Sequence, residues 1–221
     1  MLIESQACVI HLGEDASENL ATMNPEETVQ NIATYLRQFA EVPTADIEHF
    51  VAAGRSRLLE AGESFCRLGQ QTHEVAFIKA GIVRYVVTLP DGNESTKDFS
   101  FKGSFTLSFG SAAVRRPAQV AIAAVVRTEL LVWPYQVLLD RYESNMQWQK
   151  VGRRVAELLY VRKEQRELSF LLLDAEARYR QMRTQFGAQA DAIPQYFLAS
   201  YLGVRPQSLS RLKRRIADAP G

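Results

Sequence analysis

Apolar residues take up a helical period near the start of the chain. Asn24-Pro25-Glu26-Glu27 supplies a capping residue, a first-turn proline and two acids, which together favour a helix start. The residues that follow repeat at helical spacing: Val29, Ile32, Ala33, Leu36 and Phe39. A second short helix is predicted over Thr44–Ala53. Residues 1–23 show no clear period, so we interpret them as an extension, with a strand around Ala7–Leu12 as the alternative.

From Arg55 to Tyr135 the pattern changes to short runs of Val, Ile, Phe and Leu separated by glycines. The glycines recur every 7 to 12 residues, at Gly62, Gly69, Gly81, Gly92, Gly103 and Gly110. Such spacing predicts an antiparallel barrel or sandwich. Ile82–Leu89 and Glu94–Phe101, joined by a turn with an Asp-Gly pair, predict a β-hairpin. Val120–Val126 and Leu130–Trp133 are expected to complete the β-region.

Beyond Pro134 the helical period returns. One long helix is predicted over residues 144–172, where apolar residues stand among charged ones. Its partial heptad suits packing on a twin helix in a homodimer and consists of Trp148, Val151, Val155 and Leu158. Packing on the chain's own β-region is the alternative, since Arg162 and Gln165 interrupt the heptad. A further helix is predicted over Asp174–Phe186, and residues 187–193 link it to the C-terminal segment.

The segment Ile193–Ile216 has the pattern of two short helices joined by a tight turn. The apolar residues fall on one face of each helix: Leu198 and Leu202 on the first, and Leu209, Leu212 and Ile216 on the second. Gly203 suits the left-handed end of the first helix, and Pro206 suits the first turn of the second. Ala199 is small where the two helices must cross. Together these features predict a helix-turn-helix.

The second predicted helix presents DNA-binding chemistry on its other face. Gln207, Ser210, Arg211 and Arg214 point away from the leucines, while Arg205, Lys213 and Arg215 flank them. An arginine can donate two hydrogen bonds to a guanine edge, and a glutamine can pair with adenine. The flanking cations suit phosphates, which position a protein without reading sequence. A solvated basic face on an ordinary helical hairpin is the alternative.

Charge is distributed unevenly along the 221 residues. The chain has a net charge of only +1, but residues 1–149 hold 12 basic and 18 acidic side chains. Residues 150–221 hold 14 basic and 7 acidic side chains. The asymmetry assigns contact with a polyanion to the C-terminal part.

Several function classes lack their usual signals. His11, His49 and His73 are scattered and form no metal-binding pair, so no metal site is predicted and a metal-dependent barrel enzyme is disfavoured. Cys8 and Cys66 are too few for a disulfide framework or a four-thiolate cluster. No apolar run approaches the ~20 residues of a membrane span, and no signal peptide is apparent. We therefore expect a cytoplasmic protein that is not an enzyme and contacts no membrane.

The order of these elements resembles the Crp/Fnr family of bacterial transcription regulators over roughly residues 26–217. Leu59-Glu60-Ala61-Gly62-Glu63, Gly69, the run Phe77–Arg84 and Asp91-Gly92 look like that family's sensor domain. Leu198–Val204 and Ser208-Leu209-Ser210-Arg211 look like its DNA-reading end, which adds Ser208 to the predicted DNA contacts. The resemblance implies a homodimer that binds a two-fold symmetric operator in double-stranded DNA and contacts RNA polymerase.

The resemblance also indicates where an effector would bind. In family members that bind a cyclic nucleotide, a phosphate-binding cassette opens with Gly-Glu and ends with Arg-Ser. The matching residues here are Gly103, Ser104, Arg115, Arg116 and Ala118. Ser104 replaces the acid that takes the ribose hydroxyl, and Pro117 replaces the hydroxyl residue beside the arginine. Two lost hydrogen-bond partners, at about 1–3 kcal/mol each, predict weak binding of cyclic AMP, so another effector or none is the alternative.

These observations predict an α+β chain. We expect an extension at 1–23, an antiparallel β-barrel of the cyclic-nucleotide-binding type (a double-stranded β-helix) within residues 24–143, and a connecting and dimerisation helix at 144–172. An all-α helix-turn-helix domain follows at 173–221. The predicted function is a dimeric, sequence-specific DNA-binding transcription regulator with an altered cyclic-nucleotide site. The alternative is a ligand-sensing module that acts through protein partners.

Overall fold

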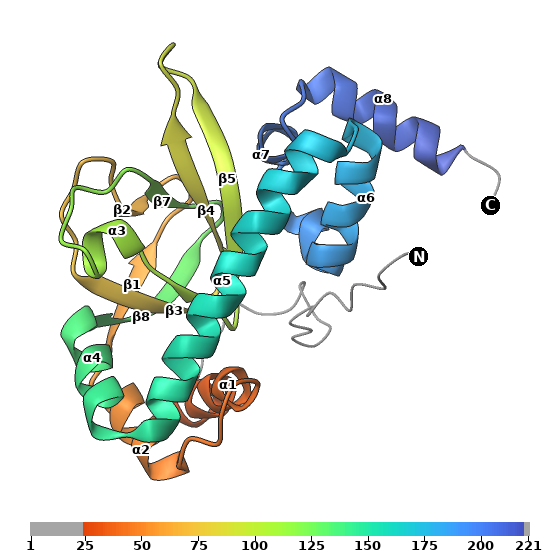
Figure 1. The fold of residues 1–221 in the computed structure, drawn as a ribbon. Coiled ribbons are helices and arrows are strands. Elements are labelled where there is room, and N and C mark those ends of the chain that lie inside the picture. Colours follow the sequence, from red (N-terminus) through yellow and green to blue (C-terminus); the bar gives the residue numbers. More distant parts are fainter. Residues whose placement is uncertain (1–23, 219–221) are drawn as a thin grey trace. The chain divides into compact units, whose positions relative to one another are not determined.

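The computed structural model describes residues 24–218, which form two compact units, 24–165 and 166–218. The predicted strand Ala7–Leu12 lies outside the described residues. The N-terminal unit contains two antiparallel sheets with flanking helices, and the C-terminal unit is helical (Figure 1). The chain is therefore α+β, as its pattern predicted.

Two helices precede the sheets. Helix α1 spans Pro25–Arg37, and its N-terminus is capped as expected, because the Glu26 N–H donates to the Asn24 side chain at 3.2 Å. Helix α2 spans Thr44–Ala52 and buries Ile47 and Phe50. Both helices thus place their apolar faces as the sequence predicted.

Eight strands form two four-stranded antiparallel sheets. The first sheet has the order β1 (Arg55–Leu59), β8 (Thr128–Pro134), β3 (Glu74–Ala80) and β6 (Phe105–Thr106). The second has the order β2 (Ser64–Cys66), β7 (Ala121–Ala124), β4 (Ile82–Thr88) and β5 (Glu94–Phe101). The predicted hairpin is β4–β5, with Ile82 opposite Phe101 and Thr88 opposite Glu94. The short helix α3 (Phe109–Ala112) lies between β6 and β7.

A buried apolar core draws side chains from both sheets. Ile78 of β3, Val83 of β4, Ile122 of β7 and Leu130 of β8 belong to one cluster. A second set of aromatic rings joins the helices to the first sheet through Phe50, whose ring stacks on Trp133 at 4.3 Å. The first cluster thus joins the two sheets, and the Phe50–Trp133 contact joins α2 to the first sheet.

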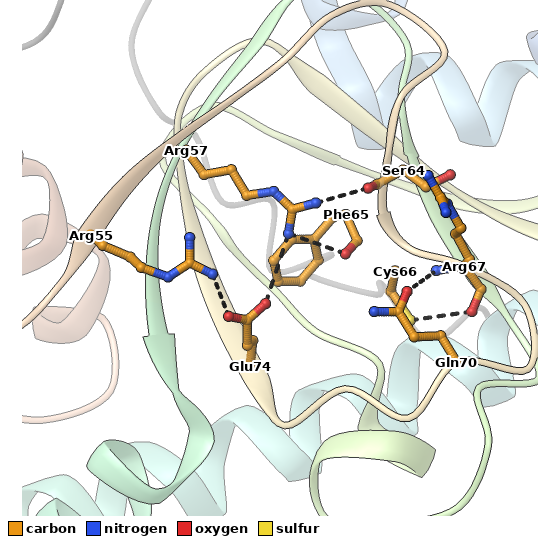
Figure 2. A network of polar contacts seen from close by, with 8 residues as sticks. All are labelled: Arg55, Arg57, Ser64, Phe65, Cys66, Arg67, Gln70 and Glu74. Carbon is orange, nitrogen blue, oxygen red and sulfur yellow. Dashed lines mark hydrogen bonds and ion pairs between the residues drawn. The ribbon is translucent and has the colours of Figure 1, made fainter.

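Arg57 links the free edges of the two sheets. Strands β1 and β2 are the edge strands of their sheets, and Arg57 on β1 donates to the carbonyls of Ser64 at 3.1 Å and Phe65 at 3.4 Å (Figure 2). Glu74 pairs with Arg57 at 3.8 Å and with Arg55 at 2.5 Å. A side chain thus satisfies carbonyls that an exposed sheet edge would otherwise present to water.

Two helices follow the last strand. Helix α4 (Tyr135–Ser144) is separated from α5 (Met146–Leu172) by Asn145, whose backbone is extended at φ −144° and ψ 120°. The Asn145 side chain accepts from the Gln147 N–H at 2.8 Å and donates to Asp46 at 2.7 Å, which fixes the break. The predicted long helix is thus confirmed, with its first residue at Met146.

Part of the predicted heptad of α5 packs within its own unit. Trp148 and Val151 are buried, and the Trp148 ring lies 5.1 Å from that of Phe50. These two residues are thus buried within their own unit, where Trp148 packs on α2.

The C-terminal unit contains four helical segments after the end of α5. They are α6 (Ala175–Phe186), the 3-10 segment η1 (Gly187–Ala192), α7 (Gln195–Leu202) and α8 (Pro206–Ala217). Asp174 caps α6 by accepting from the Ala177 N–H at 2.8 Å. Gly203 ends α7 at φ +67°, the left-handed conformation that the sequence predicted for it.

Candidate functional site

Helices α7 and α8 pack through the apolar positions predicted from the sequence. Leu198, Ala199 and Leu202 of α7 are buried, as are Leu209 and Leu212 of α8. The turn between the helices is closed by the Val204 N–H, which donates to Ala199 O at 3.0 Å. The buried leucines fix which side of α8 is left to face outward.

The outward side of α8 holds the predicted DNA contacts. Five of the seven residues are exposed, namely Arg205, Gln207, Ser208, Arg211 and Arg214, while Ser210 and Lys213 are half-buried. The Ser210 hydroxyl donates to Pro206 O at 3.1 Å, so it is engaged by its own helix. Arg205, Arg211 and Arg214 form no ion pair with any residue in 24–218. Their charges are therefore available to an anionic partner.

Arg215 differs from its neighbours on α8. Its guanidinium pairs with Glu176 of α6 at 2.6 Å, and Glu176 also pairs with Arg180 at 2.9 Å. Hydrogen bonds from Arg180 and then Arg215 lower the pKa of Glu176. The sequence suggested that Arg215 flanks the outward face as a free cation. In the structure Arg215 instead joins α8 to α6.

The first half of the predicted effector cassette is engaged within the fold. Gly103 has φ +82°, its N–H donates to Ile78 O at 2.8 Å, and Ser104 O accepts from the Ile78 N–H at 2.9 Å. The Ser104 hydroxyl donates to Phe101 O at 2.6 Å. The side chain that replaces the family's acid therefore stabilises a local turn.

The second half of the cassette follows α3. Arg115 and Arg116 are exposed, and Arg115 takes the left-handed conformation at φ +55°, which is uncommon for a residue with a side chain. Ala118 is buried in the core, and its N–H donates to Gln70 O at 2.9 Å. The two halves are thus held by different segments, β3 and the loop at Gln70, and both arginines lie at the surface.

Three hydroxyl groups inside the N-terminal unit lie close together, although the sequence did not indicate them. The Tyr85 hydroxyl of β4 lies 2.8 Å from the Thr106 hydroxyl of β6 and 3.3 Å from the Ser100 hydroxyl of β5. Burial raises the pKa of the Tyr85 phenol, although its two hydroxyl partners act in the opposite direction. Since the three residues come from three strands, no local sequence signal could have identified them.

Helix α5 contacts the β-hairpin close to these hydroxyls. Arg162 of α5 pairs with Asp98 of β5 at 3.2 Å, and both side chains are about one-third exposed. The charge of Arg162 also acts on Tyr35 of α1 and on Tyr85, where it partly offsets the effect of burial on their pKa values. Arg162 therefore connects α5 electrostatically to β5 and α1.

A separate polar hollow of about 430 Å³ opens between β1 and β2. Its lining consists of Arg57, Leu58, Leu59, Gly62, Glu63, Ser64 and Arg67 (Figure 2 shows part of this region). None of the predicted effector residues belongs to this lining.

Across residues 24–218, His, Cys, Asp and Glu form no group of three that could hold a metal ion. No helix in the same range is long and apolar enough to cross a membrane.

Comparisons with known proteins agree with this architecture. Residues 56–145 match the family of cyclic nucleotide-binding domains. The c-di-GMP-responsive regulator CLP of Xanthomonas campestris is 18% identical, with a TM-score of 0.62 over 81% of this chain and 96% of that one. FixK2 of Bradyrhizobium japonicum is 17% identical, with a TM-score of 0.61 over 74% of this chain and 84% of that one. A search of curated protein sequences finds no match.

A third solved structure has a comparable likeness. A double mutant of CooA from Carboxydothermus hydrogenoformans is 15% identical, with a TM-score of 0.62 over 76% of this chain and 78% of that one. Identities this low establish the fold and leave the ligand open. The chain thus contains a domain of the cyclic nucleotide-binding type followed by a helical C-terminal unit, and it shares the fold of CLP, FixK2 and CooA.

Proposed function

We propose that the chain is a sequence-specific DNA-binding transcription regulator that reads DNA through α8. The observation that supports this most directly is the division of α8 into a buried and an outward side. Leu209 and Leu212 are buried, while Arg205, Gln207, Arg211 and Arg214 are exposed. In this proposal α7 and α8 act as a helix-turn-helix, and α8 is the helix that enters the major groove.

The residues of α8 divide into two proposed roles. Gln207 and Arg211 lie on the outward side and have the donors that base edges require, so we assign them to base reading. Arg205, Lys213 and Arg214 are assigned to phosphates or the groove edge, with Ser208 and Ser210 beside them. The pKa of Asp191 is lowered by a hydrogen bond from Arg183 and, to a smaller extent, by the charge of Lys213, which therefore lies near this acid. Among the proposed phosphate contacts, Lys213 therefore has an acidic residue near it.

We further propose a cytoplasmic homodimer that acts on transcription without catalysing a reaction. A two-fold dimer would place two copies of α8 in successive major grooves, about one helical turn apart. RNA polymerase is the further partner that the Crp/Fnr architecture suggests.

For the N-terminal unit, we propose that DNA binding does not depend on cyclic AMP. Ser104 is engaged by Phe101 O, and Arg115 and Arg116 remain at the surface. A buried phosphate site would instead need a cation directed inward, with hydrogen-bond donors around it. Because residues 56–145 match a family of cyclic nucleotide-binding domains, another small ligand is the competing effector.

A competing function is a sensing module whose basic C-terminal unit docks on an acidic protein. The exposed arginines of α8 would serve either partner. Sequence-selective DNA binding distinguishes the two, because an acidic protein surface gives no reason for Gln207 and Arg211 to discriminate between base pairs.

The test is fluorescence anisotropy of the full chain with duplexes from a random pool enriched by the protein itself, with and without cyclic AMP. We expect enrichment of a two-fold symmetric sequence and binding that weakens steeply with salt, unchanged by the nucleotide. Binding only with cyclic AMP would overturn the effector proposal. No enrichment in either condition would overturn the DNA-reading proposal.

A further inference from the structure

The end of α7 is held by side chains from two other helices. The last carbonyls of a helix have no partner within it and bear partial negative charge. Arg166, in α5, donates from Nη2 to Tyr201 O, and Arg178, in α6, donates from Nε to Leu202 O at 3.2 Å. Two charged donors therefore satisfy the two carbonyls immediately before the turn at Gly203.

The Arg166 guanidinium also packs against two aromatic rings. Its Cζ atom lies 3.7 Å from the ring centroid of Tyr201 and 4.4 Å from that of Phe170. Both rings are thus within the range of a cation–π interaction. A planar guanidinium can stack on the rings while it donates to the carbonyl, and an ammonium group cannot do both in this way. The arrangement is therefore specific for arginine.

Phe170 closes the same site from the side of the turn. A Cβ atom added to Gly203 would lie 2.8 Å from Cε1 of the Phe170 ring, so the turn lies directly against that ring. Arg178 lies 5.0 Å from the same ring and donates to Leu173 O at 2.6 Å. We call Arg166, Phe170, Arg178 and Tyr201 the turn clamp.

We propose that Arg166 is a positioning residue for DNA recognition, because it fixes the end of α7 and thereby the direction in which α8 leaves the turn. The inference rests on the proposed function of α8. Only Val204 and Arg205 separate Gly203 from Pro206, the first residue of α8. A turn this short transmits the orientation of its first residues to the helix that follows. Base contacts require side chains placed within a few tenths of an ångström, whereas phosphate contacts tolerate more displacement.

A positioning role makes a prediction that a purely structural role does not. If Arg166 orients α8, its loss should reduce preference for the correct sequence more than it reduces general affinity for DNA. The measured quantity is the ratio of Kd for a duplex with one central base pair changed to Kd for the duplex that the wild-type chain enriches. We expect Arg166→Met, which retains an unbranched apolar side chain, to lower this ratio about tenfold, within the range that one mismatched base pair controls.

Two further variants define the effect. Arg166→Lys should recover only part of the ratio, because lysine restores the charge without the planar stacking. Arg153→Met is the matched control: Arg153 also lies in α5 and is ion-paired, with Glu157 at 2.5 Å, and it is not part of the turn clamp. Its ratio should equal that of the wild-type chain.

Three results would overturn the inference alone. One is an unchanged ratio in Arg166→Met, with both duplexes weakened in proportion to the folded fraction measured by circular dichroism. Another is an unchanged ratio with a salt slope reduced by about one, which would make Arg166 a phosphate contact. The third is an equal loss of ratio in Arg153→Met. Absence of any sequence preference in the wild-type chain would instead overturn the proposed function, and this inference with it.

Discussion

The indole N–H of Trp133 donates to the backbone carbonyl of Phe50 at 2.6 Å, deep in the N-terminal unit. The two rings also stack, with centroids 4.3 Å apart and planes at 15°. Trp148 packs on the same Phe50 ring at 5.1 Å, but its indole N–H has no hydrogen-bond partner among the described residues. Two fully buried tryptophans thus share a neighbour and differ in whether the N–H is satisfied.

This difference predicts unequal costs for the same substitution. Trp133→Phe should leave the Phe50 carbonyl without its donor, which adds about 1–3 kcal/mol to the loss from the smaller ring. Trp148→Phe loses ring volume but also removes an unsatisfied N–H, so it should lower the free energy of unfolding less. Urea unfolding of the two full-length variants, followed by circular dichroism, measures the difference. Equal destabilisation would show that the Trp133–Phe50 hydrogen bond contributes little.

Gly81 and Gly92 both have positive φ but differ in the room for an added methyl group, so the same substitution should cost different amounts of stability. Gly81 (φ +94°) lies where an added Cβ would be 2.6 Å from Arg127 O and 2.5 Å from the Thr128 hydroxyl. Gly92 (φ +83°), at the tip of the β4–β5 hairpin, has no atom within 4 Å of the same position. Gly92→Ala should therefore cost only the backbone term of about 1 kcal/mol. Gly81→Ala should cost about 3 kcal/mol or more in the same unfolding assay, because the clash involves backbone. Similar costs would mean that the Gly81 site relaxes to admit the methyl group.

Tyr35 predicts a loss of stability at alkaline pH. Burial raises its pKa from 10.0 to about 12, with the charge of Arg162 acting in the opposite direction. Between pH 10 and 12 the folded chain retains a proton that the unfolded chain has released. The ionisation of Tyr35 therefore leaves the free energy of unfolding unchanged below pH 10 and lowers it as the pH rises toward 12. The slope approaches about 1.4 kcal/mol per pH unit for one such group. Urea unfolding at several pH values should show a shallower decline for Tyr35→Phe, and an identical decline would contradict the assignment.

Features with a local pattern were predictable from the sequence. The β4–β5 hairpin, the long helix α5 and the α7–α8 pair each repeat apolar residues at the period of their own element, and Gly203 marks the turn by its need for φ > 0. The hydroxyl group at Tyr85 and the turn clamp were not predictable. Tyr85 and Thr106 are 21 residues apart, and Arg166 and Tyr201 are 35 apart. Contacts at such separations depend on tertiary packing, which periodicity does not encode. Arg215 shows the same limit, since only the fold brings Glu176 to it.

Arg211 and Lys213 should differ in what they contribute to DNA binding. Arg211 is exposed on the outward side of α8, whereas Lys213 is half-buried near Asp191. Arg211→Ala should relax preference at one base-pair position, with a cost of about 1–3 kcal/mol for the enriched duplex. Lys213→Ala should weaken all duplexes alike and reduce the salt slope by about one. Anisotropy titrations against matched and altered duplexes at several salt concentrations separate the two. Uniform weakening by both variants would remove Arg211 from base reading.

The exposed apolar residues of α5 predict where a second copy of the chain would pack. Since Trp148 and Val151 are buried, they are committed to their own unit. Beyond them, Val161, Gln165, Leu168 and Leu172 stand at spacings of four, three and four residues, in a register shifted from that of Trp148, Val151, Val155 and Leu158. Val161 is 43% exposed and Leu168 45% exposed. A twin α5 would cover these side chains, and each buried apolar residue would stabilise the dimer by about 1–2 kcal/mol.

Val161→Glu should therefore weaken the proposed dimer by at least tenfold in Kd, because it adds a charge at the seam in both copies. Leu58→Glu is the matched control, since Leu58 is 44% exposed but lies on strand β1. Sedimentation equilibrium over a range of concentrations gives the dimerisation constant of each variant, and circular dichroism verifies that both are folded. Because each half of a two-fold operator is bound by one subunit, the Val161 variant should also lose affinity for a full operator while retaining that for a half-site. A dimer weakened equally by both variants, or by neither, would exclude this heptad as the seam.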